Sequence, residues 1–172
     1  MYIVKKYYIY ITITIKNNKM KLSKNFSLKE AITSNTATKH SIDNSPNGDH
    51  ILALVALAED VFQPLREAMG VPIRISSGYR SPELNKRIGG ASSSQHSKGE
   101  ALDLQIIGKS KTNKDMFIYI LRELNFDQLI WEFGDDNNPA WIHVSYKESG
   151  NRKQVLKASK VKGKTVYTVM NV

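Results

Sequence analysis

Residues 94–103 read Ser94-Gln95-His96-Ser97-Lys98-Gly99-Glu100-Ala101-Leu102-Asp103. The pair Lys98-Gly99 predicts a tight turn, and the alternation of apolar and polar residues over 101–107 predicts a β-strand. The imidazole of His96 and the carboxylate of Asp103 can therefore converge on one site across the turn.

A second alternating segment, residues 141–146, places Trp141, His143 and Ser145 on one face of another predicted strand. His143 would then join His96 and Asp103. Two histidines and one aspartate suit a catalytic zinc ion, which takes three protein ligands and keeps a fourth position for water.

The length and the cysteine count limit the possible architectures. A chain of 172 residues is long enough for one domain with a full core. The absence of cysteine excludes disulfides and thiolate zinc sites, so a metal ion would have to be bound by His, Asp or Glu.

The basic charge is concentrated at the two ends of the chain. The formal net charge is +9, but residues 1–24 and 147–172 each carry +6, which leaves −3 for residues 25–146. A strongly basic protein could bind nucleic acid. The mildly acidic segment that carries the motifs argues against that function, and we expect no specific nucleic-acid partner.

The first residues differ in composition from the rest, and we interpret residues 1–24 as a basic N-terminal extension. The run 9–15 alternates like a strand but is too short to span a membrane, so we expect no transmembrane anchor. It also lacks the cleavage site of a signal peptide. We expect the folded domain to begin near Met20, and we assign residues 25–172 to it.

Helix signals gather in the first half of the chain. Ser27 and Glu30 form a predicted capping box, and residues 50–69 have the periodicity of a long core helix that Pro64 kinks or divides and Gly70 ends. Ser81-Pro82 predicts the start of a further short helix.

Strand signals dominate the second half. Residues 112–124 predict one amphipathic helix, and the remaining predicted strands cover residues 71–77, 101–107, 127–133 and 141–146. Residues 146–172 predict a C-terminal hairpin that turns at Lys162-Gly163. These elements predict an α+β fold with an antiparallel sheet, helices packed on one side and the site on the open face.

Three motifs together resemble the zinc D-Ala-D-Ala carboxypeptidase family, which shares the Hedgehog/DD-peptidase fold with L-alanyl-D-glutamate endolysins of phages. The resemblance covers roughly residues 26–147. It rests on Ser-Gly-Tyr-Arg at 77–80 followed by Asn85 and Gly89-Gly90, on Ser-x-His-x-x-Gly-x-Ala-x-Asp at 94–103, and on Trp-x-His at 141–143.

The resemblance implies that His96, Asp103 and His143 bind Zn2+ and that Arg80 receives a carboxylate or carbonyl of the substrate. It also implies that the substrate is a peptide of peptidoglycan that contains D-amino acids. Ser94 and Gln95 adjoin the first ligand and would position substrate or orient the imidazole. Trp141 would lie beside the site, as a packing residue or a substrate contact.

The general base is the one departure from the family pattern. Many members carry Glu or Asp three residues before the last histidine, where this chain has Ala140. Glu132 is the proposed substitute, because a simple hairpin would bring the end of its strand beside the strand of His143. Other carboxylates remain open as the base, namely Asp127, Asp135 and Asp136.

The expected activity is zinc-dependent hydrolysis of a peptide bond in peptidoglycan by a monomeric enzyme, in cell-wall lysis or remodelling. The sequence leaves carboxypeptidase and endopeptidase both open. The alternative is a non-catalytic, zinc-containing module that binds the cell wall, since a fold alone does not determine function. Action at the cell wall would require secretion, a periplasmic location or delivery by a phage.

Overall fold

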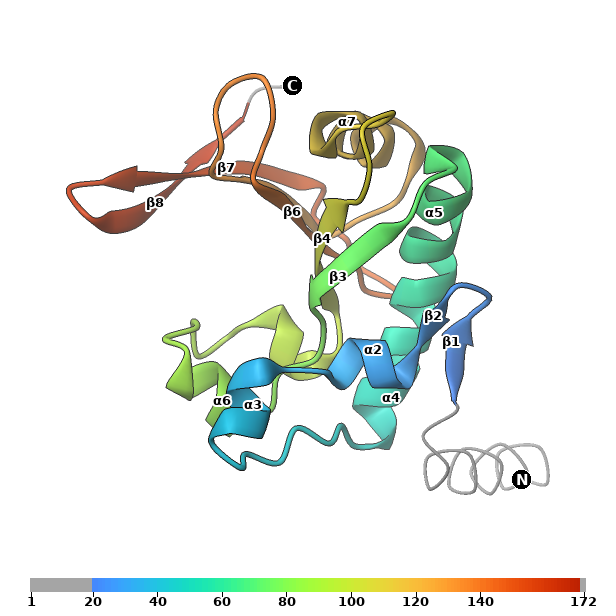
Figure 1. Cartoon of the computed structure of the whole chain (residues 1–172), viewed down its shortest axis with the longest axis vertical. Coiled ribbons are helices and arrows are strands. Elements are labelled where there is room, and N and C mark those ends of the chain that lie inside the picture. Colours follow the sequence, from blue (N-terminus) through green and yellow to red (C-terminus); the bar gives the residue numbers. More distant parts are fainter. Residues whose placement is uncertain (1–19, 171–172) are drawn as a thin grey trace.

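The computed structural model describes residues 20–170, and the predicted strand at residues 9–15 lies outside them. A six-stranded sheet forms the centre of the molecule (Figure 1). Its strands, in order across the sheet, are β3 (Ile73–Ser77), β4 (Ala101–Ile106), β6 (Trp141–Ser145), β5 (Gln128–Glu132), β7 (Gln154–Val161) and β8 (Lys164–Val169).

The helices confirm the predicted α+β class. They are α2 (Leu28–Ile32), α3 (Asn35–Lys39), α4 (Gly48–Leu57), α5 (Gln63–Met69), α6 (Pro82–Arg87) and α7 (Asn113–Glu123). A π-helical segment η1 (Ala58–Phe62) joins α4 to α5, and a 3-10 helix η2 (Gln95–Lys98) precedes β4. A short hairpin, β1 (Lys21–Ser23) and β2 (Phe26–Ser27), comes before α2, and its Leu22 is buried in the core.

The long core helix is present, and it is divided as Pro64 predicted. Proline has no N–H for the helical ladder, and its ring clashes with the carbonyl four residues earlier. The residues before it widen into the π-helical segment, where the N–H of Gln63 donates to the carbonyl of Ala58. Gly70 ends the helix with a φ of 65°, in the left-handed region.

Neighbouring strands are antiparallel except for β5 and β7, which run parallel. β6 ends and β7 begins at the same end of the sheet, beside Gln128 at the start of β5. The chain that connects them therefore passes around that end of β5. The predicted hairpin at the C-terminus is formed by β7 and β8, and its turn residues Lys162 and Gly163 have φ of 50° and 79°.

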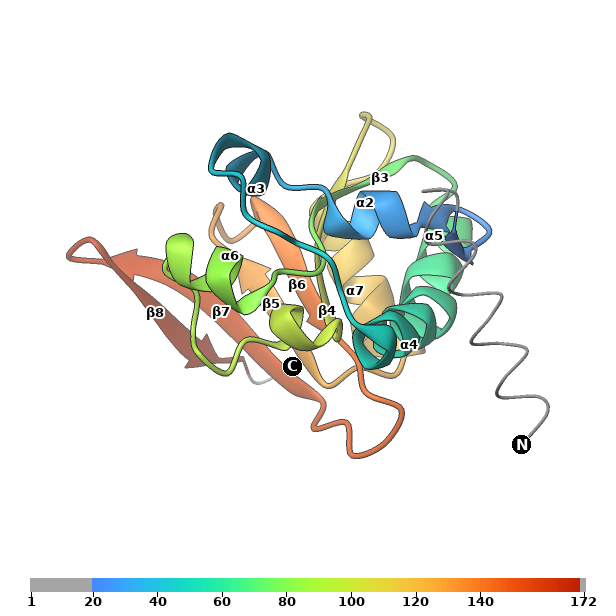
Figure 2. The same cartoon turned by 90° about the horizontal axis from the view of Figure 1, so that it is seen from below.

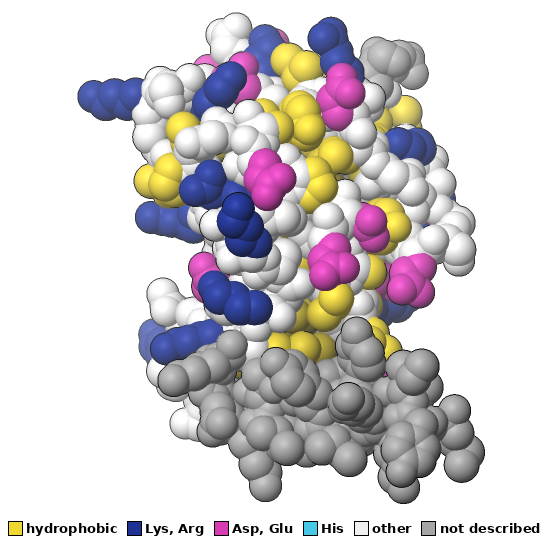
Figure 3. All heavy atoms as spheres, turned by 90° about the vertical axis from the view of Figure 1, so that its right-hand side faces the viewer, with side chains coloured by type: hydrophobic (Ala, Val, Ile, Leu, Met, Phe, Trp, Pro, Cys, Tyr) yellow, Lys and Arg dark blue, Asp and Glu magenta, His cyan; other side chains and the backbone are white. Residues whose placement is uncertain are grey.

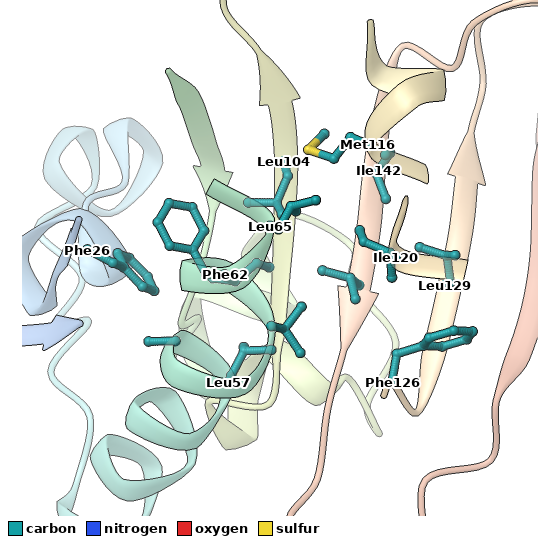
Figure 4. Packing of buried hydrophobic residues seen from close by; sticks show 14 of the residues in the cluster. Phe26, Leu57, Phe62, Leu65, Leu104, Met116, Ile120, Phe126, Leu129 and Ile142 are labelled. Carbon is teal, nitrogen blue, oxygen red and sulfur yellow. The ribbon is translucent and has the colours of Figure 1, made fainter. Parts of the chain in front are cut away.

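One face of the sheet is apolar and covered by α4, η1, α5 and α7 (Figure 4). The residues of β4, β6 and β5 that point to this face are Leu102, Leu104, Ile142, Val144, Leu129 and Trp131, and all are buried. The outer surface of α4 and α5 carries scattered acidic, basic and hydrophobic side chains (Figure 3). The intervening residues of the same strands point to the opposite face, which holds the site.

The opposite side of the sheet is bordered by two groups of elements. Figures 1 and 2 show α3 and α6 on this side at one end, and the β7–β8 hairpin extending from the other. The polar residues of β4, β6 and β5 therefore lie between these two groups.

Candidate metal centre and its cleft

Three side chains that could bind a metal ion converge from η2, β4 and β6. Asp103 and His143 are directly opposite each other on neighbouring strands, and His96 reaches them from the 3-10 helix. The Asp103 Oδ1 atom lies 3.0 Å from His143 Nδ1 and 3.3 Å from His96 Nε2, and the two ring nitrogens are 3.2 Å apart.

The backbone sets the orientation of His96. Its Nδ1 lies 2.7 Å from the carbonyl oxygen of Gly78 and donates to it, because a carbonyl can only accept. The Nε2 atom is then unprotonated and faces Asp103 and His143. Gly78 also packs closely against α2, since a Cβ there would lie 2.4 Å from the carbonyl oxygen of Ala31.

The protonation states of the group also suit a metal ion. Burial lowers the pKa of His96 despite the opposing charge of Asp103, so the imidazole is neutral at neutral pH. Burial would raise the pKa of Asp103, but its interactions with His96 and His143 outweigh burial and hold that pKa well below its usual range. Neutral imidazole and ionised carboxylate are the forms that ligate metals.

The donor set fits a cation between these three atoms. Two ring nitrogens and one carboxylate oxygen face each other, with at most one hydrogen, on His143 Nδ1, between them. Ligand atoms of a tetrahedral zinc site, bound at about 2.1 Å, lie about 3.4 Å apart. The observed separations of 3.0 to 3.3 Å are close to that spacing.

Arg80 adjoins this group. Its Nη2 lies 3.3 Å from Asp103 Oδ2, and its backbone N–H donates to the carbonyl of His96. Buried Asn44 holds the residues on both sides of Arg80, because it donates to the carbonyl of Tyr79 at 3.1 Å and accepts from the N–H of Ser81 at 2.7 Å. The guanidinium is therefore positioned by the backbone as well as by its ion pair.

Glu132 lies on the same face, at the end of β5. It lies opposite Trp141 of β6, two residues along the strand from Ile130, which lies opposite His143. Glu132 is only 6% exposed. Burial raises its pKa to about 7; His143 and Arg80 oppose this rise, and Asp103 adds to it. A carboxylate with such a pKa can exchange a proton near neutral pH.

A cavity of about 660 Å³ opens beside Arg80 and Asp103, between β3 and the start of α3. Its lining is mostly polar and includes Arg74, Ser76 and Gln105 on the sheet. The space could hold several residues of a peptide.

Comparison with known proteins identifies the family. A sequence model described as Peptidase M15 matches residues 24–145, more than half of the chain. The chain belongs to the Peptidase M15 family. The resemblance predicted from the motifs is thus confirmed, whereas no curated protein matches the sequence.

Family membership supports a peptidase that acts on a peptide substrate, with a group of three residues that could bind a metal ion. Among residues 20–170, no helix has the length and apolar character needed to cross a membrane. The match ends at β6, so the β7–β8 hairpin follows the part of the chain that defines the family.

The other three candidates for the general base make their contacts away from the candidate metal ligands. Asp127 is fully buried at the opposite end of β5 from Glu132, with Arg152 Nε at 3.0 Å and Lys147 Nζ at 3.1 Å. Asp135 accepts from two backbone N–H groups of its own loop, and Asp136 is exposed and paired with Lys157.

The predicted substrate-binding residues differ in their burial and in their contacts. Trp141 is half-buried on the site face, with its ring 5.1 Å from that of Phe133. Ser94 is half-buried as the residue before η2, whereas the side chain of Gln95 donates to Glu100 at 3.3 Å. Arg80 and Trp141 are thus the two that border the open face.

Sequence reasoning missed Asn44 as a residue that supports the site. It lies in a loop rich in Asp, Asn, Ser and Pro, where a polar side chain carries no distinctive signal. Its importance comes from its contacts with residues 32, 79 and 81, which are distant along the chain. Gly78 belongs to the Ser-Gly-Tyr-Arg motif, and that motif was the available signal.

Proposed function

We propose that this protein is a zinc-dependent peptidase that hydrolyses a peptide bond in D-amino-acid-containing stem peptides of peptidoglycan. The observation that carries the proposal is the convergence of His96, Asp103 and His143, whose facing atoms lie 3.0 to 3.3 Å apart beside Arg80. Membership of a peptidase family supports the reaction class.

In this proposal His96, Asp103 and His143 hold the ion. Zinc, when bound there, supplies a Lewis acid that polarises a peptide carbonyl and lowers the pKa of water to about 7. The carbonyl of Gly78 and the ion pair with Arg80 orient two of the ligands, as outer partners commonly do in metal sites.

Glu132 is the proposed general base. It would accept a proton from the attacking water and deliver it to the nitrogen of the leaving amine. Its buried position on the site face and its raised pKa support this role, and the contacts of Asp127 with Arg152 and Lys147 argue against that alternative.

Arg80 is the proposed binding group for a carboxylate or carbonyl oxygen of the substrate. Its guanidinium is always charged and presents several donors in a fixed plane. Trp141, Ser94 and Gln95 remain proposed substrate contacts, of which Trp141 lies directly opposite Glu132 on the neighbouring strand.

We also propose the division of the chain into a basic extension, residues 1–24, and a peptidase domain, residues 25–172, that acts as a monomer at the bacterial cell wall. The C-terminal hairpin, residues 146–172, belongs to this domain in the proposal. The pairing of β5 with β7 supports that assignment, because it joins the hairpin to the strand that carries Glu132.

The test combines metal analysis of the purified protein with mass spectrometry of peptidoglycan after incubation. We expect one zinc ion per chain and new peptide fragments, which the Glu132→Gln variant produces at least about a hundredfold more slowly. The fragment masses distinguish a carboxypeptidase from an endopeptidase. Glu123→Gln, the same change at an exposed position on α7, is the control.

Two outcomes would contradict the proposal. Stoichiometric zinc without any fragments from several wall types would favour the binding module, which Ala140 at the usual position of the base keeps open. A protein that takes up no metal would show that the three converging side chains are not ligands.

A further inference from the structure

One row of residues crosses the open face of the sheet beside the metal candidates. The pairing of β6 with β5 sets Trp141 opposite Glu132, and the pairing of β5 with β7 sets Glu132 opposite Ala158. The pairing of β7 with β8 then sets Ala158 opposite Tyr167. Residues opposite each other on neighbouring strands point to the same face, so Tyr167 belongs to the row of Glu132.

The middle of this row is occupied by a small side chain. Ala158 separates Glu132 from Tyr167, and neighbouring strands lie about 4.8 Å apart, so the two outer residues are about 10 Å apart at their Cα atoms. A tyrosine side chain can extend over an alanine in that space. Tyr167 is 52% exposed, so it is accessible to a ligand from solvent.

The charges of the site act on the Tyr167 phenol. Burial raises its pKa, the negative charges of Glu132 and Asp103 raise it further, and Arg80 opposes them. The hydroxyl therefore stays protonated at neutral pH and can donate a hydrogen bond. This interaction with three site residues agrees with the position that the strand register gives to Tyr167.

We propose that the β7–β8 hairpin forms the far wall of the substrate cleft and that Tyr167 is a substrate-binding residue, whose hydroxyl donates to a carbonyl or carboxylate oxygen of the peptide. The inference rests on the proposed peptidase function and extends it to residues beyond the family match, which ends at residue 145. Arg80 and Tyr167 would then bind the peptide from opposite sides of Glu132.

The test uses Tyr167→Phe, which removes only the hydroxyl. The first measurement is binding of a synthetic peptidoglycan stem pentapeptide ending in D-Ala-D-Ala to the metal-free protein, by calorimetry. We expect the Kd to rise about three- to tenfold, the usual effect of losing one neutral hydrogen bond. The zinc-loaded variant should show a similar rise in KM, with unchanged zinc content and Tm.

The matched control is Tyr119→Phe on α7, whose ring packs against the core on the opposite side of the sheet. It should bind and cleave the peptide as the wild type does. The inference is wrong if the Kd and KM of Tyr167→Phe stay within twofold of wild type, or if Tyr119→Phe weakens binding as much as Tyr167→Phe does. Cleavage by the wild type would still support the peptidase in either case. A wild-type protein that neither binds nor cleaves the peptide would overturn both proposals.

Discussion

The two faces of the central strands differ in what their residues do. On β4, Leu104 points to the helices and is fully buried, while its neighbour Asp103 points to the open face. On β6, Ile142 and His143 divide in the same way. Alternation along a strand therefore separates the residues that stabilise the fold from those proposed for chemistry, one position apart.

The covered face gains stability from burial. Each fully buried aliphatic side chain contributes roughly 1.5 to 3 kcal/mol. The open face instead buries polar groups, among them His96 and Glu132, and burial of such groups is unfavourable unless they are paired. The charges on this face interact mainly with one another, so removal of one of them should change the others.

The largest expected effect is that of His143→Ala. The variant loses one of three proposed ligands, so we expect no stoichiometric zinc and a fall in kcat/KM of at least about a thousandfold. The fold should remain, because the apolar face of β6 is unchanged. Metal analysis, a cleavage assay and thermal unfolding of the metal-free protein would measure the three quantities.

The neighbouring substitution Ile142→Ala is the control for the comparison. It creates a cavity beneath the helices and should lower the free energy of unfolding by about 2 to 5 kcal/mol. The folded variant should still bind one zinc ion per chain. If Ile142→Ala lost zinc at a temperature where it remains folded, the two faces of β6 would not divide fold stability from metal binding.

A smaller effect is expected for Glu132→Gln in the metal-free protein. The folded-state pKa of Glu132 is about 7, above its ordinary value of 4.5. Its stabilising contribution is therefore fully present below about pH 4.5 and is lost as the pH rises through 7. At pH 8 the variant should be more stable than wild type by about 1 to 3 kcal/mol.

Denaturant unfolding across pH 4 to 8 would measure this difference, which should shrink towards zero at the acid end. The exposed Glu123→Gln should follow wild type throughout. Equal stability of Glu132→Gln and wild type at pH 8 would mean that Glu132 bears no burial penalty and that its pKa is ordinary.

Local patterns predicted the parts of the site that lie on regular strands. The short loop before Ala140 was sufficient to predict that the strand of Glu132 neighbours the strand of His143, and the structure pairs β5 with β6. Alternation predicted the strands of Asp103 and His143, and the structure adds that β4 pairs with β6. The roles of Glu132 and of the three proposed ligands stay predictions. Alternation could predict only which residues of a single strand share a face.

Long-range contacts account for what the sequence did not predict. The parallel pairing of β7 with β5 has no local signal, since strand patterns do not encode a partner. Tyr167 joins the row of Glu132 only through that pairing. Asn44 supports Arg80 through residues more than ten positions away. Pro64 did predict a break in the core helix, but not that the break would be a π-helical segment.

The smallest expected effects come from two helix caps, one on each side of the sheet. Ser81 Oγ accepts from the N–H of Leu84 at the start of α6, and Thr112 Oγ1 accepts from the N–H of Asp115 at the start of α7. Either residue changed to alanine should lower the free energy of unfolding by about 1 kcal/mol, because one donor of the first helical turn loses its partner.

Only Ser81→Ala should also affect the proposed chemistry. Ser81 follows Arg80 directly, and its N–H donates to Asn44, so a loosened α6 would displace the guanidinium. We expect KM for a stem peptide to rise about twofold or more in Ser81→Ala and to stay unchanged in Thr112→Ala, at matched losses of stability. Equal KM values in the two variants would show that α6 does not position Arg80. Loss of a helix cap on the open face would then affect substrate binding no more than loss of a cap on the covered face.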